Sequence, residues 1–334
     1  MYRKIMGFLE AWKESEHRKP LILQGARQVG KTYSILEFGR THYENVAYFN
    51  FETNPKLNKT FEENISPDYL IPILSHIAGQ TIVTEKTLIV FDEVQLCERA
   101  LTSLKYFCEN APDYHIIVAG SLLGVAVNRA KFSFPVGKVD MKTLYPMDME
   151  EFMLALGEDD LVEQIKKCFQ TDTPLPSALH DAAMQLYRQY LVVGGMPECV
   201  MQFAETKDYI LVRHTQDTIL ASYLNDMSKY NNLNEIKKTR LAYDNITVQL
   251  SKKNTRFQYK LIKKGGRASE FENAIEWLCL SGIVSQVYKV EQIKKPLENY
   301  RDIDAFKIYV SDLGLLCAKK DLAANDILYM LSLI

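Results

Sequence analysis

The sequence has no apolar run long enough to cross a membrane. Its longest uncharged apolar stretch covers residues 116–127 and includes glycine and serine, whereas a spanning helix needs about 20 mostly apolar residues. The first residues are basic, but Glu10 and Glu14 interrupt them, and no apolar segment with a small-residue cleavage site follows. We therefore expect a cytoplasmic protein without a membrane partner.

Cysteine, glycine and proline are scarce, with 6, 15 and 11 copies among 334 residues. The cysteines form no C-x-x-C pair and have no close histidine, so a redox or cysteine-based metal site has little support. Buried, reduced thiols are the expected state. The low glycine and proline content, with 47% apolar and 25% charged residues, excludes collagen-like and low-complexity chains. The length predicts two or three globular domains.

A net charge of one sign is also missing, because 40 basic residues nearly balance 42 acidic ones. The balance is uneven along the chain, however. Residues 151–228 hold 5 basic and 12 acidic side chains, whereas residues 229–307 hold 16 and 9. The near-neutral total hides a basic segment, so it does not argue against a nucleic-acid partner.

The first part of the chain alternates short apolar runs with helical patterns. The β-like runs are residues 21–24, 46–51, 87–91, 115–119 and 139–144, and the helical patterns are residues 32–42, 68–77 and 100–109. This alternation is typical of a parallel sheet covered by helices. We predict an α/β fold over residues 1–145, with a parallel sheet and helices on both faces.

The pattern changes after Pro146. Residues 147–156 and 181–191 have amphipathic helical patterns, separated by a proline-containing connector at residues 171–180, and helices dominate up to about residue 231. The sequence Gly-Gly-Met-Pro at residues 194–197 is compatible with a hinge and equally with a plain tight turn. We predict a helical lid over residues 146–231.

A third region begins near Leu233. Ser269 and Glu272 fit a capping box at the start of a helix that Gly282 ends. Two β-like runs follow, at residues 283–290 and 306–310. Helices followed by a β-hairpin are the order of a winged helix-turn-helix domain. We predict a winged-helix-like domain over residues 232–334.

One segment fits the phosphate-binding pattern G-x-x-x-x-G-K-[ST] at every position. Its residues are Gly25, Ala26, Arg27, Gln28, Val29, Gly30, Lys31 and Thr32. Such a loop points backbone N–H groups at phosphates, and the following helix adds positive potential. Lys31 is predicted to reach the β- and γ-phosphates of ATP, and Thr32 to bind Mg²⁺. A glycine-rich turn that carries Lys-Thr by chance is the alternative.

Two carboxylates directly follow the apolar run at residues 88–91. Asp92 is placed to organise the hydration shell of Mg²⁺, and Glu93 to polarise the water that attacks the γ-phosphate. Together with the loop, they predict a P-loop NTPase sheet that supports hydrolysis as well as binding. Gln95 is a further candidate polar contact.

The next β-like run ends in Gly120 and Ser121. In additional-strand P-loop ATPases, a strand between the two motif strands carries a polar residue that senses the γ-phosphate. Ser121 is our candidate for this catalytic role, although a Gly-Ser turn leaving a strand is equally compatible. For an arginine that stabilises the transition state, the candidates are Arg129, Arg188 and Arg213, each of which could also be a solvated surface residue.

With these residues in view, the sequence resembles the AAA-type ATPases of bacteria and archaea that carry a C-terminal domain of unknown function (DUF4143-like). The matching stretches are LILQGARQVGKT, LIVFDEVQ, VAGSLLG, YLVVGGMPE and PLENYRDIDAFKIYVSDLGLL. The resemblance implies an additional-strand ATPase of the catalytic-Glu class, with nucleotide contacts at Gly25 to Thr32, Asp92 and Glu93. Many members continue into a nuclease-like domain, whereas this sequence ends at Ile334, so we predict no nuclease site.

The basic segment raises the question of a DNA partner. It holds seven cations without an acid, interleaved with Phe257 and Tyr259: Lys252, Lys253, Arg256, Lys260, Lys263, Lys264 and Arg267. A basic stripe in a winged helix is typical of double-stranded DNA binding. The expected recognition helix, residues 269–281, is acidic instead. Contact with DNA and a protein-docking or solvated face therefore both stay open.

Three functions are compatible with the sequence. The first is an ATPase that uses Mg²⁺-ATP to drive a conformational change, with ADP as product and with a protein partner or a homo-oligomer as a possible assembly. The second is a slow nucleotide-dependent switch that acts as an interaction scaffold. The third is a small-molecule phosphotransferase, which Glu93 and the additional C-terminal domain disfavour.

Overall fold

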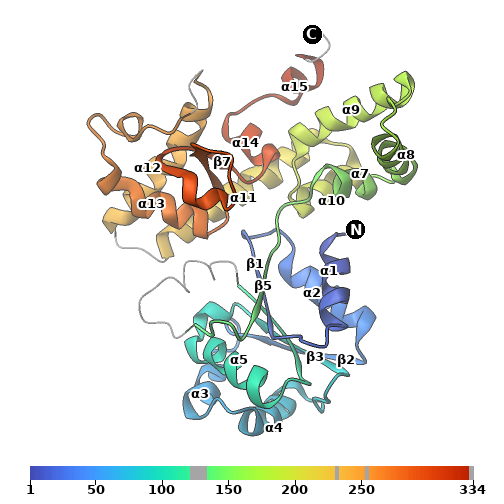
Figure 1. Ribbon diagram of the computed structural model, residues 1–334, viewed down its shortest axis with the longest axis vertical. Coiled ribbons are helices and arrows are strands. Elements are labelled where there is room, and N and C mark those ends of the chain that lie inside the picture. Colours follow the sequence, from blue (N-terminus) through green and yellow to red (C-terminus); the bar gives the residue numbers. More distant parts are fainter. Residues whose placement is uncertain (121–133, 230–232, 253–255, 331–334) are drawn as a thin grey trace. The chain divides into compact units, whose positions relative to one another are not determined.

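The computed structural model describes residues 1–120, 134–229, 233–252 and 256–330 (Figure 1). The chain divides into two compact units. Residues 3–145 form the first, here called the N-terminal unit. Residues 146–334, together with Met1 and Tyr2, form the second, here called the C-terminal unit. Each unit is described by itself.

The N-terminal unit contains a five-stranded parallel sheet. Its strands are β1 (Leu21–Gln24), β2 (Asn45–Asn50), β3 (Thr87–Asp92), β4 (His115–Ala119) and β5 (Asp140–Thr143), in the order β2-β3-β4-β1-β5. Every pairing is parallel, and β4 lies between β1 and β3. The predicted α/β fold, with an additional strand between the two motif strands, is confirmed.

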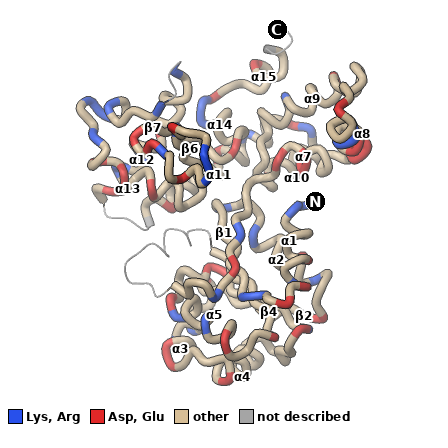
Figure 2. Tube along the Cα trace, in the orientation of Figure 1, with Lys and Arg blue, Asp and Glu red and all other residues tan. Residues whose placement is uncertain are grey.

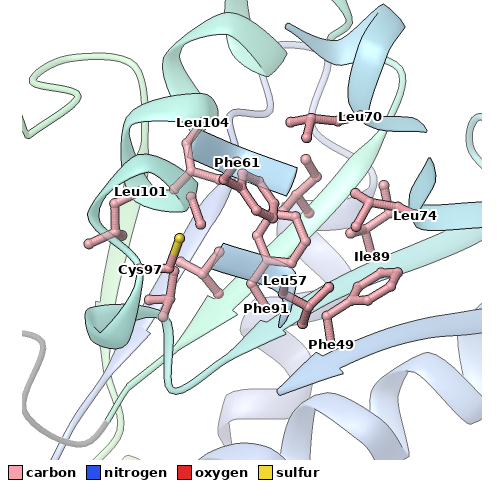
Figure 3. Close-up of a cluster of buried hydrophobic side chains, with 14 of the residues drawn as sticks. Phe49, Leu57, Phe61, Leu70, Leu74, Ile89, Phe91, Cys97, Leu101 and Leu104 are labelled. Atoms are coloured by element: carbon pink, nitrogen blue, oxygen red, sulfur yellow. The ribbon is translucent and has the colours of Figure 1, made fainter. Parts of the chain in front are cut away.

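Helices cover both faces of this sheet because its central strands are apolar on both sides, as in other parallel sheets. All six residues of β3 are buried. The helices of the N-terminal unit are α1 (Ile5–Lys13), α2 (Lys31–His42), α3 (Lys56–Glu63), α4 (Pro67–Ala78) and α5 (Glu98–Asn110), with a 3₁₀ turn at Val94–Leu96. On one face, α3, α4 and α5 pack through Phe61, Leu74 and Leu104 onto Phe91 and its neighbours (Figure 3). On the other face, α2 packs against Val46 and Leu88.

The C-terminal unit begins with helices. They are α7 (Met149–Ala155), α8 (Asp159–Gln170), α9 (Ser177–Val193), α10 (Pro197–Thr206) and α11 (Tyr209–Lys229). Asp148 and Glu151 form a capping box at the start of α7, and an apolar cluster around Met153 and Leu186 joins α7, α8 and α9. The connector predicted at residues 171–180 is shorter than expected. Helix α9 already begins at Ser177, directly after Pro176, whose backbone is not helical.

The rest of this unit combines helices with a hairpin. Its elements are α12 (Leu233–Leu250), a 3₁₀ turn (Tyr259–Leu261), α13 (Ala268–Leu280), β6 (Val284–Val290), a 3₁₀ turn (Leu297–Tyr300), β7 (Arg301–Val310), α14 (Leu313–Lys319) and α15 (Ala324–Met330). The predicted capping box at Ser269 is wrong. Helix α13 starts one residue earlier, after Arg267, and no side chain caps it. Strand β7 begins five residues before the predicted run, because Val290 of β6 pairs with Arg301.

The described helices also bear on the membrane question. None of those in the four described ranges is long and apolar enough to span a bilayer.

Candidate functional site

The glycine-rich loop connects β1 to α2 at the carboxyl edge of the parallel sheet. It turns tightly, with positive φ at Gly25, Gln28 and Gly30. A Cβ atom on Gly25 would lie 2.2 Å from the carbonyl oxygen of Leu144, so the loop can approach residue 144 only with glycine at this position. Gly30 is the N-cap of α2. The loop therefore presents backbone N–H groups and a helix N-terminus, the arrangement that binds phosphate.

Lys31 is buried inside this loop. Its Nζ donates to the carbonyl oxygens of Gly25, at 2.9 Å, and Ala26, at 2.8 Å. Burial lowers the pKa of Lys31 to about 8, while the charges of Glu93 and Asp92 act to raise it and that of Arg27 to lower it. Both of these hydrogen bonds go to neutral carbonyl oxygens. An anion that entered the loop would therefore be strongly attracted to the buried ammonium.

Asp92, at the end of β3, faces the loop. Its Oδ2 atom accepts hydrogen bonds from the Thr32 hydroxyl, at 2.9 Å, and from the Tyr48 hydroxyl, at 2.7 Å. Its Oδ1 atom accepts from the backbone N–H of Glu93, at 3.0 Å. The structure thus brings together Thr32 and Asp92, which the sequence nominated, and adds Tyr48. The only sequence signal for Tyr48 is its place near the end of the neighbouring β-like run.

Glu93 leaves the strand in an unusual backbone conformation, with a φ of 51°. This left-handed geometry is uncommon for a residue other than glycine, and such residues cluster at functional sites. The side-chain amide of Gln95 donates to the Glu93 carboxylate. Gln95, predicted as a polar contact of the site, therefore positions the carboxylate proposed to act on water.

The oxygen atoms of Thr32 and Asp92 suit a magnesium ion. Mg²⁺ prefers hard oxygen ligands and usually binds through one or two carboxylates together with phosphate oxygens and waters. A hydroxyl and a carboxylate 2.9 Å apart match that preference. No group of three or more His, Cys, Asp and Glu side chains suited to a metal occurs among the described residues. A metal at Thr32 would thus need oxygen ligands from phosphate and water as well.

Four other nominated residues lie either outside the described residues or in the C-terminal unit. Ser121 and Arg129 lie outside the described residues. Arg188 belongs to α9 and Arg213 to α11, both in the C-terminal unit. Arg213 donates to the carbonyl oxygens of Ala318 and Leu322 and lies 3.7 Å from the Asp321 carboxylate. It therefore ties α11 to the end of α14 within its own unit.

The Gly194-Gly195 sequence forms a buried turn between α9 and α10. The backbone N–H of Gly195 donates to Oδ2 of Asp312 at 2.6 Å, and the Gly195 carbonyl accepts from the N–H of Met147 at 2.6 Å. The amide of Gln216 donates to the carbonyl of Val193 at 3.0 Å. Of the two alternatives, hinge and tight turn, this geometry supports the turn.

Basic and acidic residues both occur along the basic segment, α13 and the hairpin of the C-terminal unit (Figure 2). Its described cations are exposed, whereas α13 presents Glu272 and Glu276 to solvent. A groove of about 430 Å³ lies along the hairpin. It is lined by Arg256, Val287, Tyr288, Lys289, Asp302, Ala305, Phe306, Lys307 and Tyr309. The groove along the hairpin thus combines basic and aromatic side chains, whereas Glu272 and Glu276 make the exposed face of α13 acidic.

Comparisons with known families divide the chain similarly. The family model of an AAA domain matches residues 17–153. A second model, a domain of unknown function (DUF8612), matches residues 184–326, where the resemblance had suggested a DUF4143-like domain. No curated protein sequence matches the chain.

Solved structures are similar to the chain at low sequence identity. The Walker-type ATPase PABY2304 of Pyrococcus abyssi superimposes with a TM-score of 0.58 and 13% identity, over 96% of this chain and 95% of that one. The ORC2 protein of Aeropyrum pernix gives a TM-score of 0.47 and 11% identity, over 100% and 96% of the two chains. At 13% identity, the likeness to the Pyrococcus abyssi protein concerns the fold alone.

Proposed function

We propose that this chain, an AAA-type P-loop ATPase with a C-terminal domain of unknown function, binds ATP with Mg²⁺, hydrolyses it and uses the cycle to change conformation. The observation that carries the proposal is the hydrogen bond between the Thr32 hydroxyl and Asp92, 2.9 Å long. It joins the phosphate-binding loop to the end of β3. If the loop were only a glycine-rich turn that carried Lys-Thr by chance, no contact between Thr32 and Asp92 would be expected.

Each nominated residue has a defined task in this proposal. The N–H groups of the loop and the Lys31 ammonium bind the phosphates. Thr32 and Asp92 hold Mg²⁺, which neutralises phosphate charge when it is bound. Glu93, held by Gln95, orients and deprotonates the attacking water. The γ-phosphate contact of Ser121 and an arginine finger stay predictions.

A phosphate-release assay tests hydrolysis. The Glu93→Gln variant should lose about 10²- to 10⁴-fold in kcat while it still binds ATP, because it keeps the shape and the Gln95 contact but not the base. Glu62→Gln is the matched control, since Glu62 is exposed on α3. ATP binding without phosphate release by the wild type would favour the slow switch. A wild-type rate in Glu93→Gln would contradict the role of Glu93.

The lid, the winged helix and the assembly state are also part of the proposal. The order of α12, α13, β6 and β7, with the Phe257 N–H bonded to the Phe306 carbonyl at 2.8 Å, supports a winged helix. We propose cytoplasmic activity in which ATP draws the C-terminal unit toward the nucleotide. A mass measurement with and without ATP tests whether a second copy is recruited.

Contact with double-stranded DNA is a second candidate function, and the groove along the hairpin favours it. Phosphates would meet Arg256, Lys289 and Lys307 there, because the acidic exposed face of α13 would repel them. The double variant Lys289→Ala/Lys307→Ala should lower the slope of log affinity against log salt concentration by about 2. Lys56→Ala/Lys59→Ala, on exposed residues of α3, is the control. Absence of salt-dependent DNA affinity in the wild type would favour the alternative, a protein-docking or solvated face.

A further inference from the structure

Arg3 lies just before α1 and is buried, with 5% of its surface exposed. Arginine is rarely buried unless its charge is paired or hydrogen-bonded. One guanidinium nitrogen, Nη1, donates to the carbonyl oxygen of Val29 at 2.9 Å. The other, Nη2, donates to the carbonyl oxygen of Tyr145 at 2.7 Å. The side chain thus bridges two backbone positions that are far apart in the sequence.

The Val29 carbonyl is half of a peptide group inside the phosphate-binding loop. Its other half is the N–H of Gly30, and the two point in opposite directions because the peptide is planar and trans. A charged donor on the carbonyl side therefore fixes the direction of the Gly30 N–H. Hydrogen bonding to the carbonyl also polarises the peptide and makes the N–H a better donor.

The Tyr145 carbonyl belongs to the segment that leaves the N-terminal unit. The two residues before Tyr145, Thr143 and Leu144, contact Gln24 and Gly25 at the start of the loop. The Leu144 N–H donates to the Gln24 carbonyl at 2.8 Å, and the Gln24 amide donates to the Thr143 hydroxyl at 3.0 Å. Gly25 packs against the Leu144 carbonyl. The exit segment is therefore attached to the loop at its start directly and near its end through Arg3. The next residue, Pro146, begins the C-terminal unit.

We propose that Arg3 is a positioning residue for nucleotide binding. It orients the Val29–Gly30 peptide toward the phosphates and transmits the state of the loop to residue 145, from which the chain enters the C-terminal unit. The inference rests on the proposed function, because it assumes that the loop binds a nucleotide. It gives this N-terminal arginine, which none of the sequence motifs includes, a task in coupling ATP to conformational change.

Calorimetric titration of the full chain with ADP distinguishes a role of Arg3 in nucleotide binding from a purely structural role in holding α1 in place. The Arg3→Met variant keeps most of the apolar stem but has no donor, so its affinity should fall about 10- to 100-fold. Arg3→Lys keeps a charged donor and should recover part of the loss. Arg18→Met is the control for anchoring of α1, because Arg18 donates to the carbonyl oxygen of Lys13, the last residue of α1, at 2.8 Å. Its affinity should stay within about twofold of the wild type.

Hydrogen exchange of residues 143–147 provides the second measurement. In the wild type, ADP should change the exchange of these amides, and in Arg3→Met the change should be lost at an ADP concentration that saturates the variant. Wild-type affinity together with a wild-type exchange response in folded Arg3→Met would overturn the inference. If Arg3→Met does not fold, Arg3→Lys replaces it, with an expected affinity loss of at least threefold. Failure of both the wild type and Arg18→Met to bind ADP would instead refute the proposed function.

Discussion

Both units of the chain place an aspartate against a glycine-containing turn, yet the two aspartates have different partners. Asp92 and Asp312 are equally hidden, with 5% and 4% of their surfaces exposed. Asp92 accepts from two side-chain hydroxyls, those of Thr32 and Tyr48. Asp312 accepts from the backbone N–H groups of Gly195, at 2.6 Å, and Leu315, at 2.8 Å.

The two aspartates differ in whether their hydrogen-bond donors can be replaced by a ligand. A hydroxyl can rotate away and bind a metal or a phosphate, whereas a backbone N–H is fixed by the fold. The charges of Asp92 and Glu93 both act on Lys31. Asp312 instead lies near neutral Tyr190, Tyr223 and Cys199, whose pKa values burial raises. Burial alone therefore does not identify a functional carboxylate. Substitutions at the Asp312 turn should change stability, and those around Asp92 should change ligand binding.

The largest expected effect is the loss of stability in Gly195→Ala. A Cβ atom there would lie 1.9 Å from the Met147 carbonyl oxygen, so the backbone of the turn must move. We expect the free energy of unfolding of the C-terminal unit to fall by about 4 kcal/mol or more. Scanning calorimetry measures it, with Gly7→Ala as control, since a Cβ on Gly7 lies within 4 Å of no atom beyond its chain neighbours and the backbone of its own helix. An unchanged transition in Gly195→Ala would remove the contrast between the two turns.

A smaller loss is expected in Asp312→Asn, and it should depend on pH. Burial raises the pKa of Asp312 to about 6 from 3.8. The folded state thus binds the proton more tightly than the unfolded state, so the contribution of this group to stability falls as pH rises from about 4 to 6. The stability difference between wild type and variant should be greater at pH 4 than at pH 7 by up to roughly 3 kcal/mol. Denaturant titrations at four pH values measure it, and parallel pH profiles would contradict the buried-carboxylate assignment.

Sequence patterns predicted the N-terminal unit better because its signals are local. Residues 21–24 and 115–119 match β1 and β4 in full, since an apolar run between turn residues defines a buried strand within a few positions. The loop motif likewise fixes its own backbone through nearby glycines. The local signal at Ser269 gave a wrong capping box. Serine and glutamate three residues apart can also both lie inside the first turns of a helix, and here the helix begins at Ala268, one residue before Ser269.

The missed contacts join residues that are distant in the sequence. Tyr48 and Asp92 are separated by 44 positions. The separation is 117 positions for Gly195 and Asp312, and 142 positions for Arg3 and Tyr145. No periodicity or spacing encodes such pairs, because they arise only when the strands and helices pack. The roles of Ser121 and of an arginine finger stay predictions.

The third effect, after those of Gly195→Ala and Asp312→Asn, is a pH dependence of ADP affinity that arises from Lys31. It should not change the stability of the C-terminal unit. Burial lowers the pKa of Lys31 to about 8 in the nucleotide-free protein, whereas bound phosphates would hold the proton on it. Nucleotide binding then takes up a proton above pH 8, and ADP affinity should fall about tenfold per pH unit from there. Titrations at pH 7, 8 and 9 measure it. Lys31→Met should bind weakly with no such decline, and a flat wild-type profile would place the lysine outside the phosphate site.

The smallest effect should come from Tyr48→Phe, which tests whether the partners of Asp92 are functional. The Tyr48 hydroxyl shares the Oδ2 atom with Thr32, and it can keep the carboxylate aligned when Thr32 turns toward Mg²⁺. Its loss should raise the Mg²⁺ concentration for half-maximal hydrolysis about fivefold, corresponding to about 1 kcal/mol, with little change in melting temperature. Tyr33→Phe is the control, because Tyr33 lies on α2 with 59% of its surface exposed. If Tyr48→Phe lowered the melting temperature and left the Mg²⁺ response unchanged, the bonds to Asp92 would be structural, like those to Asp312, and the contrast between the two aspartates would fail.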